Sequence, residues 1–312
     1  MRRLSILLAA LAVAVAACGG DSASTTTTAP AGGSVATTDG SVATTDGSAA
    51  TTTVAPATTG ETSTSMAEPS TTTSSASETT TTVVPAPPLT PGELTVGVLP
   101  FGDGVRTYLV AVPPDYSADS PAPVIIDLHG RGQTAVDHAI NSGITEFAWP
   151  YGYVVVHPQG IGEIPAWPIQ PGNPGTADEV AYFGLILDTL AADLTIDTER
   201  VFVSGFSMGG GMANRLACDL ADRITGIAVV AASLEGWLDC EPSEPVSVLA
   251  IHGLADQVAP FGGIAPNLPQ MGDWVARWAG FNGCGRDPVP SQTVTGRIWY
   301  WPACDDGATV TL

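Results

Sequence analysis

The sequence predicts an α/β fold in which a mostly parallel central sheet is flanked by helices. Short, uninterrupted apolar runs recur along the chain, as is typical of strands that are buried on both faces. Segments of helical length separate these runs. All aromatic residues lie within 101–312, so we place the folded domain at residues 91–312, a length that suffices for one sizeable core.

The elements of this domain are expected in the following order. Leu94–Leu99 and Val105–Val112 flank a Gly-Asp-Gly turn and predict an opening hairpin. Further strands are expected at Val124–Leu128, Tyr153–Val156, Val201–Ser204, Ile227–Ala231 and Val246–Ile251. Helices are expected at about 134–147, 177–193, 208–221 and 269–280, with Asp178-Glu179 near a helix start. The stretch 158–176 is rich in Pro and Gly and predicts a long loop on the substrate side.

The segment before this domain predicts export. Residues 1–17 have the features of a signal peptide, because Arg2 and Arg3 precede an apolar run that is too short for a permanent membrane span. The run ends in Val-Ala-Ala-Cys18, which resembles a bacterial lipobox and implies diacylation of Cys18. Such an anchor would hold the protein on the outer face of a membrane. The alternative is an ordinary cleaved signal and a secreted protein.

Residues 18–90 predict a disordered tether. They are rich in Ser and Thr, contain no aromatic residue and repeat the unit SVATTDG at 34–40 and 41–47. Each unit has too few apolar side chains to bury a coiled-coil seam.

The charge balance excludes some partners. The chain has 10 basic residues, all Arg, against 31 acidic ones, a net charge of -21. No basic block is present, and an acidic surface repels phosphate backbones, so we expect no nucleic-acid partner. We expect a monomer.

The motif that carries chemistry is Gly205-Phe206-Ser207-Met208-Gly209. It lies between a predicted strand and a predicted helix, the context of a nucleophile elbow, so Ser207 is the candidate nucleophile. The first oxyanion-hole donor is expected to be the backbone N–H of Met208. The second is expected after Val124–Leu128, from Arg131 or alternatively Gly130. The side chain of His129 is expected to brace that loop.

The candidate acid is Asp256. It lies on the loop that follows Val246–Ile251, where a carboxylate could hold a histidine in the required tautomer. His252 is expected to be structural.

Three segments together resemble a known family. GFSMGGGMANRLACD, IIDLHGRGQ and IHGLADQVAPF are similar to α/β-hydrolase esterases of the polyhydroxybutyrate depolymerase and feruloyl or acetylxylan esterase type. The resemblance runs from about Val105 to Leu312. It implies an α/β-hydrolase that cleaves carboxylic esters of polyhydroxyalkanoates, ferulate or acetylated polysaccharides through a Ser-Asp-His triad. It implies no cofactor.

None of the histidines in the sequence lies at the position that the base of that triad requires. In this fold the histidine follows the acid, but all four histidines, His129, His138, His157 and His252, precede Asp256. The sequence Ala308–Leu312 is similar to a final strand that ends mid-run. We therefore expect a truncated chain in which the final strand and the loop with the catalytic histidine are missing, and in which activity is nearly absent. The alternative is a non-catalytic envelope lipoprotein that uses the fold for binding.

With Cys18 lipidated, four cysteines remain, which suggests two disulfides in an exported chain. Of three possible connectivities we favour Cys218–Cys240 and Cys284–Cys304; the alternative is free thiols. No C-x-x-C motif is present, so no metal is expected.

Several aromatic side chains could form a platform for substrate, although helix packing of Trp274 and Trp278 is the simpler interpretation. The set is Trp167, Trp274, Trp278, Phe281 and Trp299.

Overall fold

A computed structural model describes residues 88–170, 174–232, 234, 240–285 and 287–312. The predicted signal peptide, Cys18 and nearly all of the tether lie outside the described residues. Within the described ranges, no helix combines the length and the apolar character that a membrane crossing needs.

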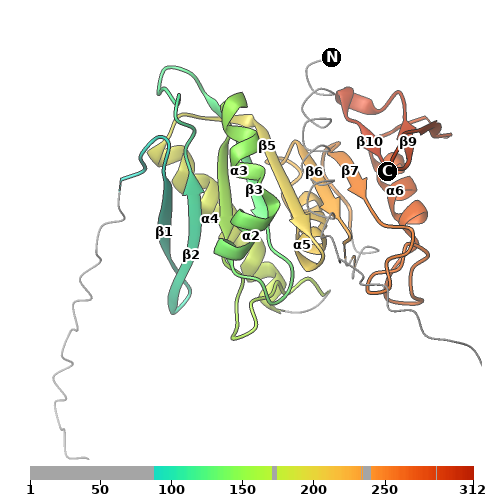
Figure 1. The fold of residues 1–312 in the computed structure, drawn as a ribbon, viewed down its shortest axis with the longest axis horizontal. Coiled ribbons are helices and arrows are strands. Elements are labelled where there is room, and N and C mark those ends of the chain that lie inside the picture. The colour runs from blue at the N-terminus through green and yellow to red at the C-terminus, as the bar shows by residue number, and fades with distance from the viewer. Residues whose placement is uncertain (1–87, 171–173, 233, 235–239, 286) are drawn as a thin grey trace, which may run out of the picture. The chain divides into compact units, whose positions relative to one another are not determined.

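A ten-stranded sheet forms the centre of the described part of the chain (Figure 1). Its order is β1-β2-β4-β3-β5-β6-β7-β10-β9-β8. The six strands from β4 to β10 in this order run parallel, and antiparallel strands extend the sheet at both edges. The bounds are β1 Leu94–Phe101, β2 Gly104–Ala111, β3 Ala122–Leu128, β4 Val154–Pro158, β5 Ile196–Phe206, β6 Gly226–Val230, β7 Ser247–Ile251, β8 Val289–Gln292, β9 Arg297–Trp301 and β10 Val310–Thr311.

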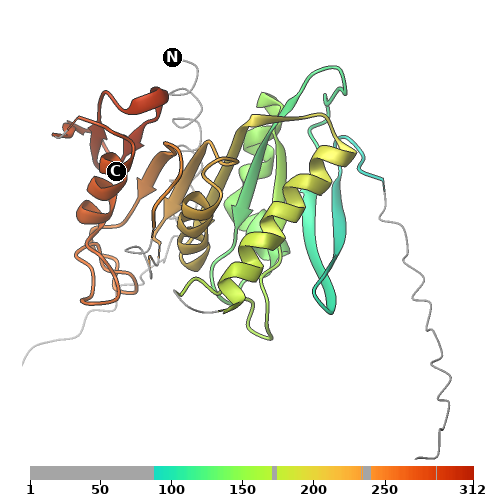
Figure 2. The same cartoon turned by 180° about the vertical axis from the view of Figure 1, so that it is seen from behind.

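Helices cover both faces of the sheet. Helices α2 (Ala135–Ser142) and α3 (Ile144–Ala148) lie on one face, and α4 (Pro174–Asp193) and α5 (Met208–Asp219) lie on the other (Figures 1 and 2). Helix α6 (Met271–Phe281) shares the face of α5, because two of its tryptophans donate to the side chain of Asn214 in α5. Short 3-10 turns occur at Trp149–Tyr151 and Asp305–Gly307.

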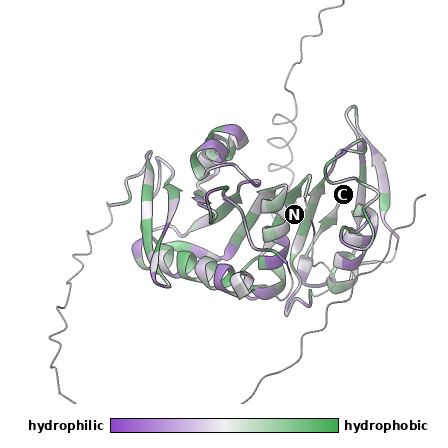
Figure 3. Ribbon diagram, turned by 90° about the horizontal axis from the view of Figure 1, so that it is seen from below, coloured by the Kyte–Doolittle hydropathy of each residue, from purple (hydrophilic) through white to green (hydrophobic). Residues whose placement is uncertain are grey.

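The core lies between the sheet and these helices, as the apolar colouring of the central strands in Figure 3 shows. The parallel strands are buried on both faces, which explains their uninterrupted apolar runs. The largest fully buried side chains are Trp167, Trp274, Trp278, Tyr182 and Phe183. The predicted strand–helix order and the mostly parallel sheet are thus confirmed.

Some predicted boundaries were wrong. The expected helix 134–147 is two helices, because Gly143 adopts a left-handed conformation with φ 61° and ends α2. The strand expected at Val201–Ser204 extends from Ile196 to Phe206. The β8–β9 hairpin was not expected, since Val289–Gln292 contains a proline and is exposed throughout.

The run Ala308–Leu312 forms more of a strand than expected. Val310–Thr311 is β10, which pairs parallel with β7 and antiparallel with β9, and the backbone of Leu312 exchanges two hydrogen bonds with Trp299. This part of the final strand is therefore present in the sheet.

The predicted disulfide pairing is confirmed. Cys218 at the end of α5 bonds to Cys240, and Cys284 after α6 bonds to Cys304. Each bridge closes a local segment, with sequence separations of 22 and 20 residues.

Candidate active site

Ser207 lies at the turn between β5 and α5, at the carboxyl end of a central parallel strand. Its backbone has φ 54° and ψ -119°, a strained conformation for a residue with a side chain. The turn is held by a hydrogen bond from the Ser207 N–H to the carbonyl of Val230 in the next strand, at 2.9 Å. This is the backbone geometry that a nucleophile elbow requires.

Two glycines allow the elbow to form. A Cβ on Gly205 would collide with the backbone of Gly209 one turn later, and a Cβ on Gly209 would collide with the carbonyl oxygens of Leu128 and His129. The first turn of α5 therefore rests directly on the end of β3. This close approach places the loop after β3 beside Ser207.

The hydrogen bonds of that loop distinguish between the two candidate oxyanion donors. The N–H of Gly130 is engaged by the side-chain oxygen of Gln133 at 2.9 Å, and the N–H of Gly132 by the carbonyl of Pro165 at 2.7 Å. Within the described part of the chain, the backbone N–H groups of Arg131 and Met208 donate to no protein acceptor. These two donors are available to a substrate oxygen.

His129 is buried and holds the loop from both sides. Its Nδ1 lies 2.8 Å from the carbonyl of Gly130, and its Nε2 accepts the N–H of Gly160 at 2.9 Å. Nδ1 therefore carries the proton and the ring is neutral. Burial lowers the pKa of His129, outweighing the hydrogen bond to Gly130 that raises it. The ring is a brace and not a free base.

Asp256 lies on the loop after β7, at the same sheet edge as Ser207, because β5, β6 and β7 are adjacent parallel strands. Its Oδ1 accepts the N–H groups of Val258 at 2.8 Å and Ala259 at 2.9 Å. The bond from Ala259, with that from Val258, lowers the pKa of Asp256. The carboxylate is thus ionised and fixed in orientation.

The ring of His252 is buried beside Asp256, but its hydrogen bond is to a backbone carbonyl and not to the Asp256 carboxylate. Its Nε2 donates to the carbonyl of Ala259 at 2.5 Å and lies 3.6 Å from Oδ2 of Asp256. The ring thereby closes the Asp256 loop on itself.

The sequence analysis did not predict a cluster of buried polar side chains around Asp127, between the sheet and helix α2. Asp127 of β3 is buried among His138 of α2, at 3.1 Å, and His157 of β4, at 3.4 Å. Its oxygens also accept the hydroxyls of Ser142 and Ser204. Burial alone would raise the pKa of Asp127, but the two histidines hold it well below its usual range. An acid inside the apolar run Val124–Leu128 was the available signal, since a buried carboxylate needs partners.

A third buried contact fixes the loop after β4. Arg106 of β2 binds both oxygens of Glu179, donates to the carbonyl of Gln159 at 3.0 Å and lies over the ring of Tyr182 at 4.0 Å. Glu179 was expected near the start of its helix. It is instead buried five residues after the helix begins at Pro174, since the Arg106 guanidinium compensates its charge.

The structure confirms helix packing of Trp274 and Trp278 as the simpler interpretation and leaves little of the alternative aromatic platform. Trp167, on the loop between β4 and α4, is buried, packs on His129 and Phe183, and donates its indole N–H to the carbonyl of His129 at 2.8 Å. Trp274 and Trp278 are helix-packing residues. Of the five aromatic residues, only Phe281 and Trp299 are not buried.

Comparisons with known proteins agree with this geometry. Residues 106–239 match the family described as Esterase PHB depolymerase. The chain is 31% identical over 188 residues to a protein named probable feruloyl esterase C of Aspergillus niger, covering 57% of this chain and 63% of that one. It is 29% identical over 223 residues to feruloyl esterase B of Piromyces equi, and the match covers 66% of this chain and 41% of that one. The chain thus spans less than two thirds of either relative.

Among solved structures, acetyl xylan esterase from Aspergillus awamori matches with a TM-score of 0.54 and 15% identity, over 70% of this chain and 91% of that chain. A likeness at this identity concerns the fold alone. Together with the parallel sheet and the elbow after β5, it shows that the chain has the α/β-hydrolase fold.

Proposed function

We propose that the protein is an extracytoplasmic serine esterase that cleaves carboxylic esters of the feruloyl, acetyl-polysaccharide or polyhydroxyalkanoate type. The observation that carries this proposal is the strained Ser207 beside the unbonded N–H groups of Arg131 and Met208. The matched family and the feruloyl esterase relatives support it.

In this proposal Ser207 Oγ attacks the ester carbonyl carbon while a histidine takes the hydroxyl proton. The N–H groups of Met208 and Arg131 bind the oxyanion, and Asp256 orients the histidine and stabilises its positive charge. The same histidine returns the proton to the leaving alcohol. Water then attacks the acyl-enzyme and releases the acid.

The base we propose is a histidine that follows residue 312 in a longer chain. Each of the four histidines of residues 1–312 is bonded to partners other than Ser207, as described above. The chain ending at Leu312 is therefore proposed to retain only a small residual activity.

Exposed apolar side chains surround the carboxyl ends of the parallel strands. Phe206 follows Gly205 at the elbow, and its ring lies over Gly130. The others are on the loops after β4 and β7: Ile161, Ile164, Leu254 and Val258. These side chains favour an apolar or aromatic acyl group over a charged one.

The proposed location is the outer face of a membrane, through Cys18, or the secreted medium. Two disulfides support an oxidising compartment. Fatty-acid labelling that depends on Cys18 would test the anchor, and label retained in Cys18→Ala would contradict it.

The activity is tested with two forms of the protein, one ending at Leu312 and one extended by whatever follows in the gene. The extended form is expected to hydrolyse p-nitrophenyl acetate and methyl ferulate, and Ser207→Ala is expected to abolish both activities. Ser120→Ala, on the exposed loop between β2 and β3, is the matched control. Equal rates for Ser207→Ala and the unchanged extended protein would refute the serine mechanism and favour a binding function.

A further inference from the structure

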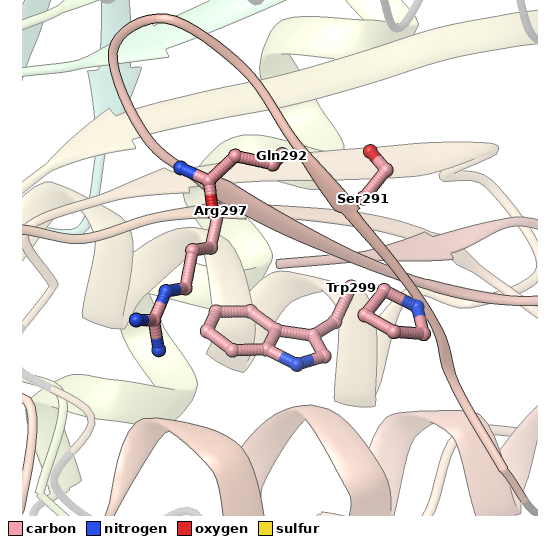
Figure 4. A pocket seen from close by; sticks show the side chains of 5 residues that line it. Ser291, Gln292, Arg297 and Trp299 are labelled. Atoms are coloured by element: carbon pink, nitrogen blue, oxygen red, sulfur yellow. The ribbon is translucent and has the colours of Figure 1, made fainter.

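The β8–β9 hairpin carries a groove of about 390 Å³ that belongs to a different part of the chain from the Ser207 site (Figure 4). It is lined by Pro290, Ser291, Gln292, Arg297 and Trp299. Pro290 pairs with Trp299, and Gln292 pairs with Arg297. Directly paired residues share a face of the sheet, and the two pairs are two residues apart along each strand. The side chains of Pro290, Gln292, Arg297 and Trp299 therefore lie on the same side of the hairpin.

Hydrogen bonds within the turn define the conformation of this exposed hairpin. Its turn is closed by the Thr293 N–H, which donates to the carbonyl of Gly296 at 2.8 Å, and by the Gly296 N–H, which donates to the Thr293 hydroxyl at 2.9 Å. The side-chain amide of Gln292 donates to the carbonyls of Thr293 and Gly296. The Oε1 of Gln292, a residue that lines the groove, accepts no hydrogen bond from the described residues and remains available as an acceptor.

Trp299 supplies a fixed aromatic surface. Its backbone exchanges two hydrogen bonds with Leu312, at 2.7 and 2.9 Å, and its indole packs against the main core cluster while remaining partly exposed. An indole held in this way loses little conformational entropy when it binds a ligand, which favours stacking on the apolar face of a sugar ring.

Arg297 is an uncompensated cation in an acidic protein. Arg106, Arg200, Arg215 and Arg223 each pair with a carboxylate. Among the described residues Arg297 has neither an ion pair nor a side-chain hydrogen bond. Its guanidinium lies next to Trp299 along β9 (Figure 4). A guanidinium presents a planar fork of donors that matches a carboxylate.

We propose that this groove is a subsite for a uronic acid residue of an acidic polysaccharide. The Trp299 indole stacks on the pyranose ring, the Arg297 guanidinium binds the sugar carboxylate, and Gln292 Oε1 accepts a hydroxyl. The site holds the polymer that carries the ester bonds and takes no part in cleavage, so it deepens the proposed function while standing on different residues.

Because the protein has a large negative net charge, its long-range electrostatic field does not attract an acidic polysaccharide to the groove. A net charge of -21 repels polyanions at long range, so an acidic polymer gains affinity here only through direct contacts. Poly-glutamate, which has carboxylates but no sugar ring, is therefore expected not to bind.

The test is calorimetric titration of the full chain with a xylo-oligosaccharide that carries one glucuronic acid, compared with neutral xylotriose. Binding of the acidic sugar is expected to be about tenfold tighter. Arg297→Gln is expected to remove that difference, and Arg297→Lys to keep only part of it because the fork is lost. Arg223→Gln, which removes one positive charge from a partly exposed site in another part of the chain, is the matched control and is expected to retain the difference.

Three outcomes would overturn the proposal: no detectable binding of the acidic sugar, equal binding of the two sugars, or equal binding by the unchanged chain and Arg297→Gln. Ser207→Ala separates this proposal from the esterase proposal, because it is expected to bind the acidic sugar unchanged. Loss of binding in Arg131→Gln but not in Arg297→Gln would place the sugar at the Ser207 site and also contradict the subsite.

Discussion

Asp127 and Asp256 both lie beside histidines, yet they occupy opposite environments. Asp127 is enclosed under the sheet between His138 and His157, with both oxygens occupied by protein donors. Asp256 lies on a partly exposed loop at the carboxyl edge, and its Oδ1 is held by two backbone N–H groups. An Asp–His contact alone therefore does not identify a catalytic pair. Position at the strand edge and access to a substrate distinguish the second from the first.

The largest expected effect concerns activity at Asp256. In an extended chain that has the base, Asp256→Asn is expected to lower kcat by about 10⁴, because the histidine loses its orienting charge. The free energy of unfolding is expected to change by less than about 1 kcal/mol, since the side chain is partly exposed. Steady-state kinetics and urea unfolding measure the two effects. A kcat within tenfold of the parent would assign the acid role to another residue.

Asp127→Ala tests the other environment. It leaves two buried imidazoles without their ion-pair partner and two hydroxyls without their acceptor, so a loss of about 3–5 kcal/mol in the free energy of unfolding is expected. Urea denaturation gives this value. Asp137→Ala would be a poor control because Asp137 closes the capping box of α2, so Asp119→Ala on the surface loop serves instead. Equal stability of the Asp127 variant and the control would show that the buried cluster contributes nothing.

Asp127 and Asp256 are also expected to differ in how they affect the dependence of the free energy of unfolding on pH. The folded-state pKa of Asp127 is held below its usual value, so its contribution is complete above about pH 4 and is lost as the pH falls through and below that value. Asp127→Ala is expected to flatten the dependence of the unfolding free energy on pH between about pH 4 and 2. Asp256→Asn is expected to alter it less, since solvent screens its charge. Parallel curves for Asp127→Ala and the parent would contradict this assignment.

The smallest expected effect concerns His252. His252→Phe removes the hydrogen bond to the Ala259 carbonyl, and a loss of about 1 kcal/mol is expected. In an extended, active chain kcat is expected to fall by less than tenfold, because the ring only supports the Asp256 loop. A loss comparable with that of Asp256→Asn would make His252 the proton acceptor.

The candidate site left clearer signals in the sequence than the buried polar contacts around it did. The elbow was recognisable because Gly205 must be glycine for α5 to approach β5, and Gly209 must be glycine for α5 to approach the end of β3, so both requirements fall within one short motif. The cluster around Asp127 left no such motif, because its histidines come from α2 and β4 and meet only after the sheet has formed. The same holds for the pair of Arg106 and Glu179, which lie 73 residues apart.

The sequence by itself determined the layered fold and the identity of the candidate nucleophile and acid, because each depends on short patterns and on neighbouring segments. It favoured the disulfide pairing that the structure has, but left two other connectivities open. Only the tertiary structure decided which backbone N–H groups beside Ser207 are free, since Gly132 donates to Pro165 of another loop, and Gly130 donates to the side chain of Gln133 in the loop's folded conformation. It also decided that Trp167 is buried while Trp299 faces a groove. Burial is a property of the packed chain, and identical side chains have different roles according to what covers them.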